Sequence, residues 1–284
     1  MGKRGSGSSP AGGRMPPARA EATPAVEIDA LGGDPNFMTS LARGLAVIRA
    51  FSQQRRRQSI AEISRLTGIP RAAVRRCLYT LFRLGYVAAD ERYFSLQPKV
   101  LALGHAYLSS TPLAVSAQPF LDRVSRAAHE SCSLAVLDGD EILYVARAAT
   151  TTRIMSVDLS VGSRLPVYCT SMGRVLLANL ASGELSALLS RVRLKPLTDR
   201  TVTSREKLLQ ILEGTRRAGY AVVDQELEIG LRSIAVPVSD AAGKVVAAMN
   251  VSAQAGRIAV REMEAQFLPL LRSAAAELDT LLLA

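Results

Sequence analysis

The chain contains 284 residues, carries a formal net charge of +10 and is 48% hydrophobic. No stretch approaches the ~18 consecutive apolar residues of a membrane-spanning helix, and the basic N-terminus lacks the apolar segment of a secretory signal. We therefore expect neither a membrane-spanning nor a secreted protein, and we predict a cytoplasmic protein with two globular domains.

The cysteine and histidine content restricts the chemistry further. Cys77, Cys132 and Cys169 are widely spaced and include no C-x-x-C pair, which argues against a disulfide framework and a structural zinc site. His105 and His129 are the two histidines, so candidates for metal binding or general-base catalysis are few. We expect no metal and no cofactor.

Residues 1–37 are rich in Gly, Ser, Pro and Ala and show no periodicity, so we predict a disordered tail. A first helix is expected from Thr39. Its predicted apolar stripe consists of Leu41, Leu45, Ile48 and Phe51. This helix is expected to pack across the two helices that follow.

The stretch from Ser59 to Leu84 has the pattern of a helix-turn-helix. Ser59 and Glu62 form a capping box, Gly68 ends the first helix, and Pro70 suits the first position of the second. The second helix buries one face and exposes a basic one. Val74, Cys77, Leu78 and Leu81 form the apolar face, and Ala72, Arg75, Arg76, Tyr79 and Arg83 the opposite one.

Charge favours DNA as the partner of this segment. Residues 38–97 contain eleven arginines, no lysine and three acids, whereas an ordinary solvated face mixes both signs. We expect the second helix to read the major groove through five residues: Arg71, Ala72, Ala73, Arg75 and Arg76. The loop arginines Arg55, Arg56 and Arg57 are expected to contact phosphates.

A hairpin and a linker helix are predicted after Gly85. Two β-prone runs, 86–89 and 93–96, flank the polar turn at residues 90–92 and resemble the wing of a winged helix. The DNA-binding domain then covers residues 38–97, and residues 98–112 form a linker helix.

The remaining residues, 113–284, have nearly balanced charge and alternate between helices and strands. We predict β-strands at residues 131–137, 142–148, 153–158, 220–224, 233–238 and 244–252. Helices are predicted at 115–129, near Thr170, near Ser182, from a capping box at Thr203 and Glu206 to Gly219, and from Ile258 onward. The fold class is α+β, with a mainly antiparallel sheet.

Two features of this second domain suggest a ligand site. Asn250 and Ser252 put polar groups on one face of an otherwise apolar strand, and Ser233 opens a neighbouring one. The helix that starts near Thr170, Ser171 and Met172 presents free N–H groups suited to a carboxylate. Local backbone capping explains the strand residues equally well, and a plain N-cap explains the helix start. A rival enzymatic hypothesis makes Cys169 a nucleophile with His129 as its base.

The motifs GSRLPVYCTSMGRVLLA (162–178) and DQELEIGLRSIAVPV (224–238), together with the winged helix, resemble the IclR family of bacterial transcriptional regulators. DPNFMTSLARGLAVI (34–48) and the longer stretch 153–178 are similar to its PcaR/PobR/PcaU group. The resemblance implies a winged helix, a linker and a GAF-like α/β effector domain, in dimers and often tetramers. It implies a regulator and not an enzyme; a contact with RNA polymerase stays open.

The resemblance also implies an effector and a site. That group responds to 4-hydroxybenzoate, protocatechuate or β-ketoadipate, and an unrelated small organic acid is the alternative. The family's effector residues correspond here to Ser171, Met172, Ser233, Asn250 and Ser252. Where other members have consecutive acids before the G-L-R motif, this chain has Val-Asp at 223–224, which argues against a small keto acid. Arg147, Arg153 and Arg164 are possible counter-charges that we expect at the surface.

Overall fold

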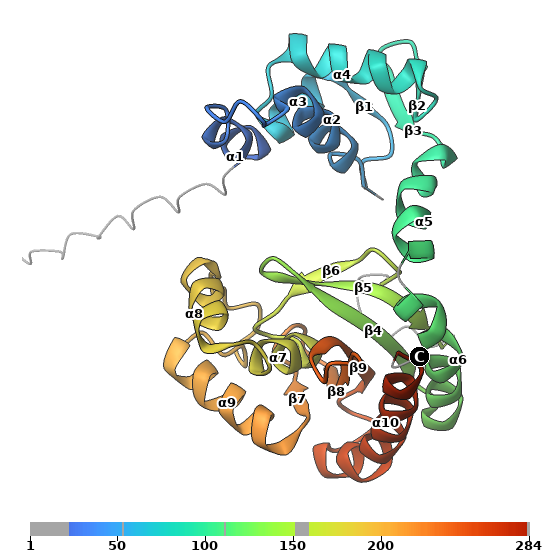
Figure 1. Ribbon diagram of the computed structural model, residues 1–284, viewed down its shortest axis with the longest axis vertical. Coiled ribbons are helices and arrows are strands. Elements are labelled where there is room, and N and C mark those ends of the chain that lie inside the picture. Colours follow the sequence, from blue (N-terminus) through green and yellow to red (C-terminus); the bar gives the residue numbers. More distant parts are fainter. Residues whose placement is uncertain (1–22, 53, 111, 151–158, 283–284) are drawn as a thin grey trace, which may run out of the picture. The chain divides into compact units, whose positions relative to one another are not determined.

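The computed structural model describes residues 23–52, 54–110, 112–150 and 159–282 and contains two compact units (Figure 1). The division falls between Gly104 and His105, inside helix α5 (Leu101–Ser110). A short 3₁₀ turn, η1 (Pro98–Val100), precedes α5, so a helix forms inside the predicted linker of residues 98–112 but is shorter than predicted, and Pro112 already belongs to the next helix.

The first unit is a winged helix-turn-helix. Its helices are α1 (Pro24–Ala30), α2 (Thr39–Arg49), α3 (Ile60–Thr67) and α4 (Arg71–Arg83). Its strands are β1 (Gln58–Ser59), β2 (Val87–Asp90) and β3 (Tyr93–Leu96), in the order β1-β3-β2. The predicted hairpin is confirmed, and β1 adds a third strand that the sequence did not indicate.

Local chemistry sets the helix-turn-helix. The Ser59 hydroxyl accepts the N–H of Glu62 at 3.3 Å, and the Glu62 carboxylate accepts the N–H of Ser59 at 2.8 Å, so the capping box is confirmed. Gly68 ends α3 with φ +74°, a conformation that favours glycine. Pro70 is the N-cap of α4 and not its first residue, so that prediction is wrong by one position.

Two predictions for the N-terminal part are wrong. Part of the predicted disordered tail, Pro24–Ala30, forms helix α1, because Ile28 is buried in the core of the unit and Pro24 favours the first turn of a helix. In α2, Leu41 and Leu45 are 58% and 50% exposed. Helix α2 is apolar on two sides, and Ala46 and Val47 are the residues it buries; it packs on α3 and α4 as expected.

The second unit is built on a six-stranded antiparallel sheet, whose strand order is β6-β5-β4-β9-β8-β7. The strands are β4 (Ser131–Asp138), β5 (Glu141–Ala148), β6 (Arg164–Pro166), β7 (Ala221–Asp224), β8 (Leu231–Ser239) and β9 (Val245–Gln254). The α+β prediction is confirmed. The strand predicted at 153–158 lies outside the described residues.

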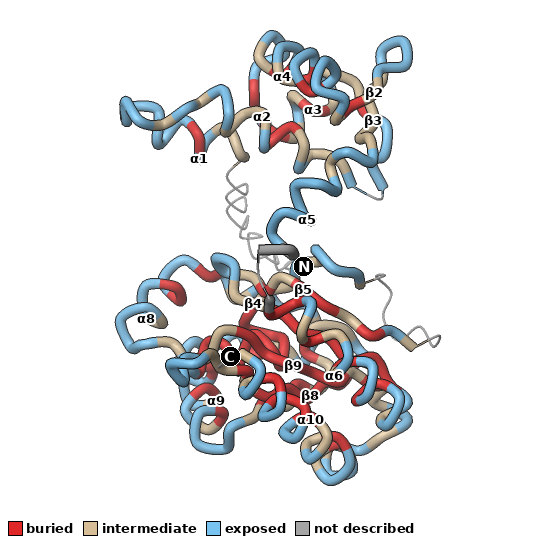
Figure 2. Tube along the Cα trace, turned by 45° about the vertical axis from the view of Figure 1, so that its right-hand side comes forward, coloured by how far each residue is buried: buried red, intermediate tan, exposed pale blue. Residues whose placement is uncertain are grey.

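Helices cover both faces of this sheet, and the buried residues concentrate between them and the strands (Figures 1 and 2). Helices α6 (Pro112–Ala128) and α10 (Val260–Leu282) cover one face. Helix α7 (Ser171–Ala178) packs on the other face, with α8 (Ser182–Arg191) and α9 (Arg205–Ala218) outside it. The N-cap of α9 is Ser204 and not Thr203; its hydroxyl accepts the N–H of Lys207.

The described residues can be examined for membrane-spanning helices and for clusters of metal-binding side chains. None of their helices combines the length and the apolar character that a bilayer crossing demands. Within the same ranges, no group of three or more His, Cys, Asp or Glu side chains is arranged to hold a metal ion.

Candidate nucleic-acid interface and effector site

Helix α4 presents most of its predicted DNA-reading residues to solvent. Val74 and Leu78 are fully buried and fix the rotation of the helix. As a result Arg71, Ala72, Arg75 and Arg76 are exposed. Ala73 instead packs partly buried against the core of the unit, so it is a weaker candidate than predicted.

The predicted phosphate-binding loop lies beside the wing, because β1 pairs with β3 directly after it. Arg55, Arg56 and Arg57 are all exposed. Arg57 forms an ion pair with Asp90, and its guanidinium lies 5.4 Å from the Tyr93 ring centroid. Arg57 is therefore partly neutralised, whereas Arg55 and Arg56 have no ion pair among the described residues.

A groove between α2 and α4 is lined by apolar side chains together with Ser40, Arg43, Arg76 and Thr80. It has a volume of about 480 Å³. Met38, Leu41, Leu45 and Leu84 line it, and each is at least half exposed. Contiguous exposed apolar side chains of this kind mark contact surfaces.

In the second unit, strand register gathers polar side chains on the sheet face that α7 covers. Ser133 of β4 pairs with Arg147 of β5 on one side and with Asn250 of β9 on the other. Ser252 of β9 pairs with Ser233 of β8. Since directly paired residues share a face, these side chains lie together over the sheet.

The start of α7 lies over the same polar patch. Thr170 is its N-cap, and the Thr170 hydroxyl accepts the N–H of Gly173 at 3.2 Å and donates to the carbonyl of Pro166 at 3.0 Å. A Cβ at position 173 would lie 2.1 Å from the Val167 carbonyl oxygen, so glycine is required there. Ser171 and Met172 are both buried at the start of α7, which packs on β8 and β9.

All six predicted effector residues line one small cavity of about 20 Å³, which has room for about one water molecule. They are Thr170, Ser171, Met172, Ser233, Asn250 and Ser252. The other walls are mostly apolar and include Tyr144, Leu165, Val223, Leu227 and Leu231. The fold therefore brings these distant stretches of the chain together around one cavity.

Three buried polar atoms in this region have no hydrogen-bond partner within the described part of the chain: Ser171 Oγ, Asn250 Oδ1 and Arg147 Nε. Arg147 Nη1 donates to Ser133 Oγ at 2.8 Å, and Ser133 is paired with Asn250 on the next strand, although Arg147 itself is not among the residues that line the cavity. Asn250 Nδ2 donates to Ser252 Oγ at 3.0 Å, which leaves its oxygen unpaired. Ser171 and Asn250 belong to the cavity lining, and an unsatisfied buried polar group is costly, so each of these atoms calls for an explanation.

Arg147 is the residue that the sequence prediction left at the surface, and that prediction is wrong. Simple alternation from Ile142 and Tyr144 places Ala146 on their face of β5 and Arg147 on the opposite one. The pairing with β4 shifts register after Tyr144, which makes Val145 an extra residue and moves Arg147 to the α7 side. Arg164, by contrast, is a surface residue as predicted, paired with Asp138 and Glu141.

The Val-Asp pair at 223–224 divides between two roles. Val223 is buried and lines the cavity. Asp224 accepts from Arg232 Nε at 2.8 Å, and this hydrogen bond lowers the pKa of the Asp224 carboxyl. The cavity wall is thus apolar where an acid would repel a carboxylate.

The enzymatic alternative fails on geometry and on protonation. Burial raises the pKa of the Cys169 thiol to about 12, so no thiolate is available near neutral pH. His129 is exposed just after the end of α6, on the sheet face opposite α7. The two residues therefore cannot form a nucleophile–base pair.

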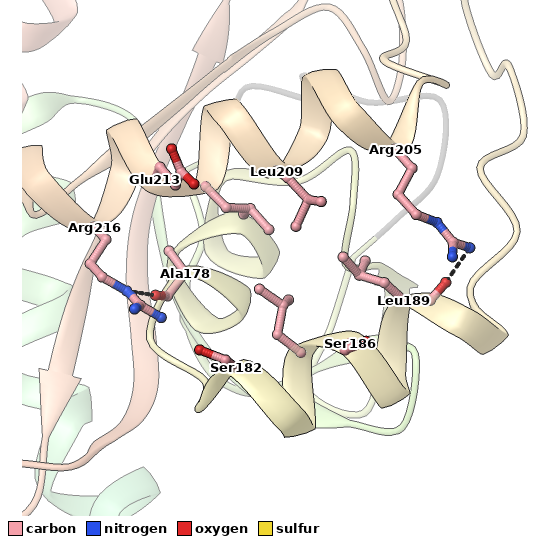
Figure 3. Close-up of a pocket in the computed structure, with 10 residues that line it drawn as sticks. Ala178, Ser182, Ser186, Leu189, Arg205, Leu209, Glu213 and Arg216 are labelled. Atoms are coloured by element: carbon pink, nitrogen blue, oxygen red, sulfur yellow. Dashed lines mark hydrogen bonds between the residues drawn. The ribbon is translucent and has the colours of Figure 1, made fainter.

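A larger groove of about 320 Å³ lies between α8 and α9, away from the predicted residues (Figure 3). Leu209 of α9 faces Leu189 and Ser186 of α8 across it. Arg205 donates to the carbonyl of Leu189, and Arg216 donates to the carbonyl of Ala178. These two arginines cap the C-terminal ends of α8 and α7, a structural role.

Comparison with known proteins gives matches over both units. The profile described as IclR helix-turn-helix domain matches residues 40–91, and the one described as bacterial transcriptional regulator IclR C-terminal matches residues 105–280. The Pca regulon regulatory protein of Pseudomonas putida is 59% identical over 257 residues, covering 90% of this chain and 88% of that protein.

Two further relatives extend the comparison. The p-hydroxybenzoate hydroxylase transcriptional activator of Acinetobacter baylyi is 38% identical over 87% of this chain and 92% of its own length. A crystal structure of an IclR homolog complexed with 4-hydroxybenzoate, from Microbacterium hydrocarbonoxydans, superimposes with a TM-score of 0.74 at 28% identity. It covers 86% of this chain and 98% of that one.

Proposed function

Since the chain belongs to the IclR family of bacterial transcriptional regulators, we propose that it controls genes of aromatic-acid catabolism in response to a small carboxylate. The similarity to a Pca regulon regulator over nine-tenths of the chain supports the choice of pathway. The observation that carries the ligand class is the pair of unpaired polar atoms on the cavity residues Ser171 and Asn250, with the unpaired Nε of Arg147 on the same sheet face, next to Ser133.

These three groups suit a carboxylate. A guanidinium supplies charge-assisted hydrogen bonds to an anion, and the N-terminal end of α7 adds a favourable dipole. The Ser171 hydroxyl donates to a carboxylate oxygen, and Asn250 Oδ1 accepts from a hydroxyl of the ligand. The apolar walls from Tyr144 and Leu165 favour an effector whose remaining body is flat or aliphatic.

The candidate effectors are 4-hydroxybenzoate, protocatechuate and β-ketoadipate, with an unrelated small organic acid as the alternative. Each is much larger than a cavity of about 20 Å³, so binding must displace part of the wall. A ligand that binds only the expanded form shifts the protein toward that form. This is the proposed origin of the regulatory response.

DNA recognition is assigned to the domain of residues 38–97, preceding the linker of residues 98–112 and the effector domain of residues 113–284. Four exposed side chains of α4 (Arg71, Ala72, Arg75 and Arg76) are proposed to enter the major groove. Arg55 and Arg56 are proposed to bind phosphates, with a smaller contribution from Arg57. We propose that the protein acts in the cytoplasm. A contact between the DNA-bound protein and RNA polymerase is compatible with this role.

We further propose that the protein functions as a homodimer or a tetramer. The apolar groove between α2 and α4, and the exposed Leu101 and Leu103 of α5, are surfaces that a second copy would cover. Two winged helices in one dimer read paired half-sites and so multiply discrimination. Sedimentation of a monomer at micromolar concentration, with and without operator DNA, would contradict this.

The direct test is calorimetry of the full chain with each of the three acids. One of them should bind with micromolar affinity or better, and it should change the affinity of the protein for its operator. If none binds and operator affinity responds to none, the pathway assignment is wrong. If the protein responds to a different organic acid, the proposed carboxylate site stands and the proposed pathway is wrong.

A further inference from the structure

A buried ion pair joins two elements that line the effector cavity, although the pair itself does not line it. Arg174 Nη2 lies 2.7 Å from Glu226 Oε2, and the two side chains are 3% and 9% exposed. Arg174 belongs to α7, whose first residues include Ser171. Glu226 lies in the turn between β7 and β8, next to the cavity residue Leu227.

Each charged group of the pair also has a backbone partner. Arg174 Nε donates to the carbonyl of Tyr168 at 3.0 Å, and Glu226 Oε2 accepts the N–H of Val202 at 2.9 Å. Three segments that are far apart in the sequence therefore meet at one buried charge pair. Buried ions are tolerated only when such hydrogen bonds satisfy them, so the geometry of the pair is strongly specified.

The loop that contains Val202 also holds the backbone of the turn between β7 and β8. The Thr198 hydroxyl donates to the carbonyl of Gln225 at 2.8 Å, and the Thr201 hydroxyl donates to the carbonyl of Glu226 at 2.6 Å. Gln225 has φ +61°, a conformation that costs energy for a residue other than glycine. Such a backbone persists only because its surroundings fix it, so this side of the cavity is rigid.

We propose that Arg174 and Glu226 are positioning residues of the effector site. Resting on the proposed function, the inference is that the ion pair holds the start of α7 at a fixed distance from the β7–β8 side of the cavity. Ser171 and Ser233 then keep the positions in which they can bind the carboxylate, and a different part of the cavity wall moves when the ligand enters. Neither charged side chain touches the ligand. Preorganisation of this kind raises affinity because less ordering is required on binding.

The first test replaces Glu226 by Gln, which keeps the shape and removes the charge. Calorimetry of the full chain with 4-hydroxybenzoate, or with whichever of the three acids the wild type binds, should show affinity at least about tenfold weaker. Operator affinity without effector should stay within about twofold, since the pair lies in the other unit. Glu213→Gln, the same change at an exposed residue of α9, is the matched control and should bind like wild type.

A second variant separates positioning from folding. In Arg174→Met with Glu226→Leu, an apolar pair of similar volume replaces the ions, and the variant is expected to fold with a melting temperature lowered only by the loss of two hydrogen bonds to the backbone. It cannot bond to Tyr168 or Val202, so effector binding should still be weakened. Arg174→Lys keeps the charge with fewer hydrogen bonds, and its affinity should fall between wild type and Glu226→Gln.

The outcomes distinguish this inference from the proposed function. Wild-type affinity in a folded Glu226→Gln or Met/Leu variant would overturn the positioning role while leaving the carboxylate site intact. Failure of the wild-type chain to bind any of the acids would instead overturn the proposed function. If Glu226→Gln does not fold, the Met/Leu and Lys variants decide the matter by the same comparison.

Discussion

The two units of this protein build their sites in opposite ways. The DNA-binding unit concentrates positive charge on exposed side chains of one short helix and one loop. Substitution of one such exposed residue should leave the rest of the fold unchanged. The effector unit buries its polar atoms between a sheet and α7, and three of them are unpaired within the described ranges. Residues close together in the sequence determine a charged surface site. A buried site depends instead on how several strands pair with one another.

This contrast predicts different sensitivities, and Arg147 should show the largest. Replacing Arg147 by Met removes the proposed counter-charge of the effector while keeping much of the apolar length. Charge-assisted hydrogen bonds contribute roughly 1.5–3 kcal/mol each, so effector affinity should fall by about a hundredfold. Calorimetry checks this, with Arg164→Met as the surface control that should bind normally. Equal losses in both variants would mean that only overall charge matters.

The recognition helix should show the next largest effect. Replacing Arg75 or Arg76 by Ala should cost about 1–3 kcal/mol in operator binding if that residue reads a base, and it should relax specificity at one base pair. Effector affinity should not change. Binding assays on operator and on single-base variants measure both quantities. Wild-type operator affinity in the Arg71, Arg75 and Arg76 variants alike would show that α4 is not the reading helix.

Asn250 tests the buried side of the comparison with a smaller change. Asn250→Val places an apolar, β-branched side chain that suits a strand and removes the polar atoms, so effector binding should weaken about tenfold, or about 1.4 kcal/mol. Operator binding should remain intact because the residue is buried in the other unit. Titration of the variant with the effector, followed by operator binding without it, measures both. If affinity for the acid is unchanged, Asn250 is structural.

The smallest effects are expected in the loop before α3. Neutralising Arg55 or Arg56 should reduce the salt dependence of DNA binding by about 0.9 in log–log slope for each phosphate that the variant no longer neutralises. Arg57→Gln should change the slope less, because Arg57 is already paired with Asp90. Specific and random DNA should be affected alike. A slope that all three substitutions leave unchanged would show that the loop points away from DNA.

Local chemistry made the first unit predictable. The capping box of Ser59 and Glu62, the left-handed Gly68 and the hairpin turn each depend on residues within a few positions of one another. The charge excess needed only counting. The failures there were non-local: β1 joins the wing through a distant strand, and α2 buries Ala46 and Val47 and leaves Leu41 exposed.

In the second unit the sequence determined which residue types could form a site, since a polar stripe on an apolar strand and a capped helix are visible without a fold. The six predicted effector residues do share one cavity. Only the tertiary structure decided that Arg147 lies on the same sheet face as Asn250 and Ser252, because a one-residue shift in strand pairing reverses the face on which a side chain lies. The pairing of Arg174 with Glu226, 52 positions away, likewise depends on how α7 packs over the sheet, which no local pattern encodes.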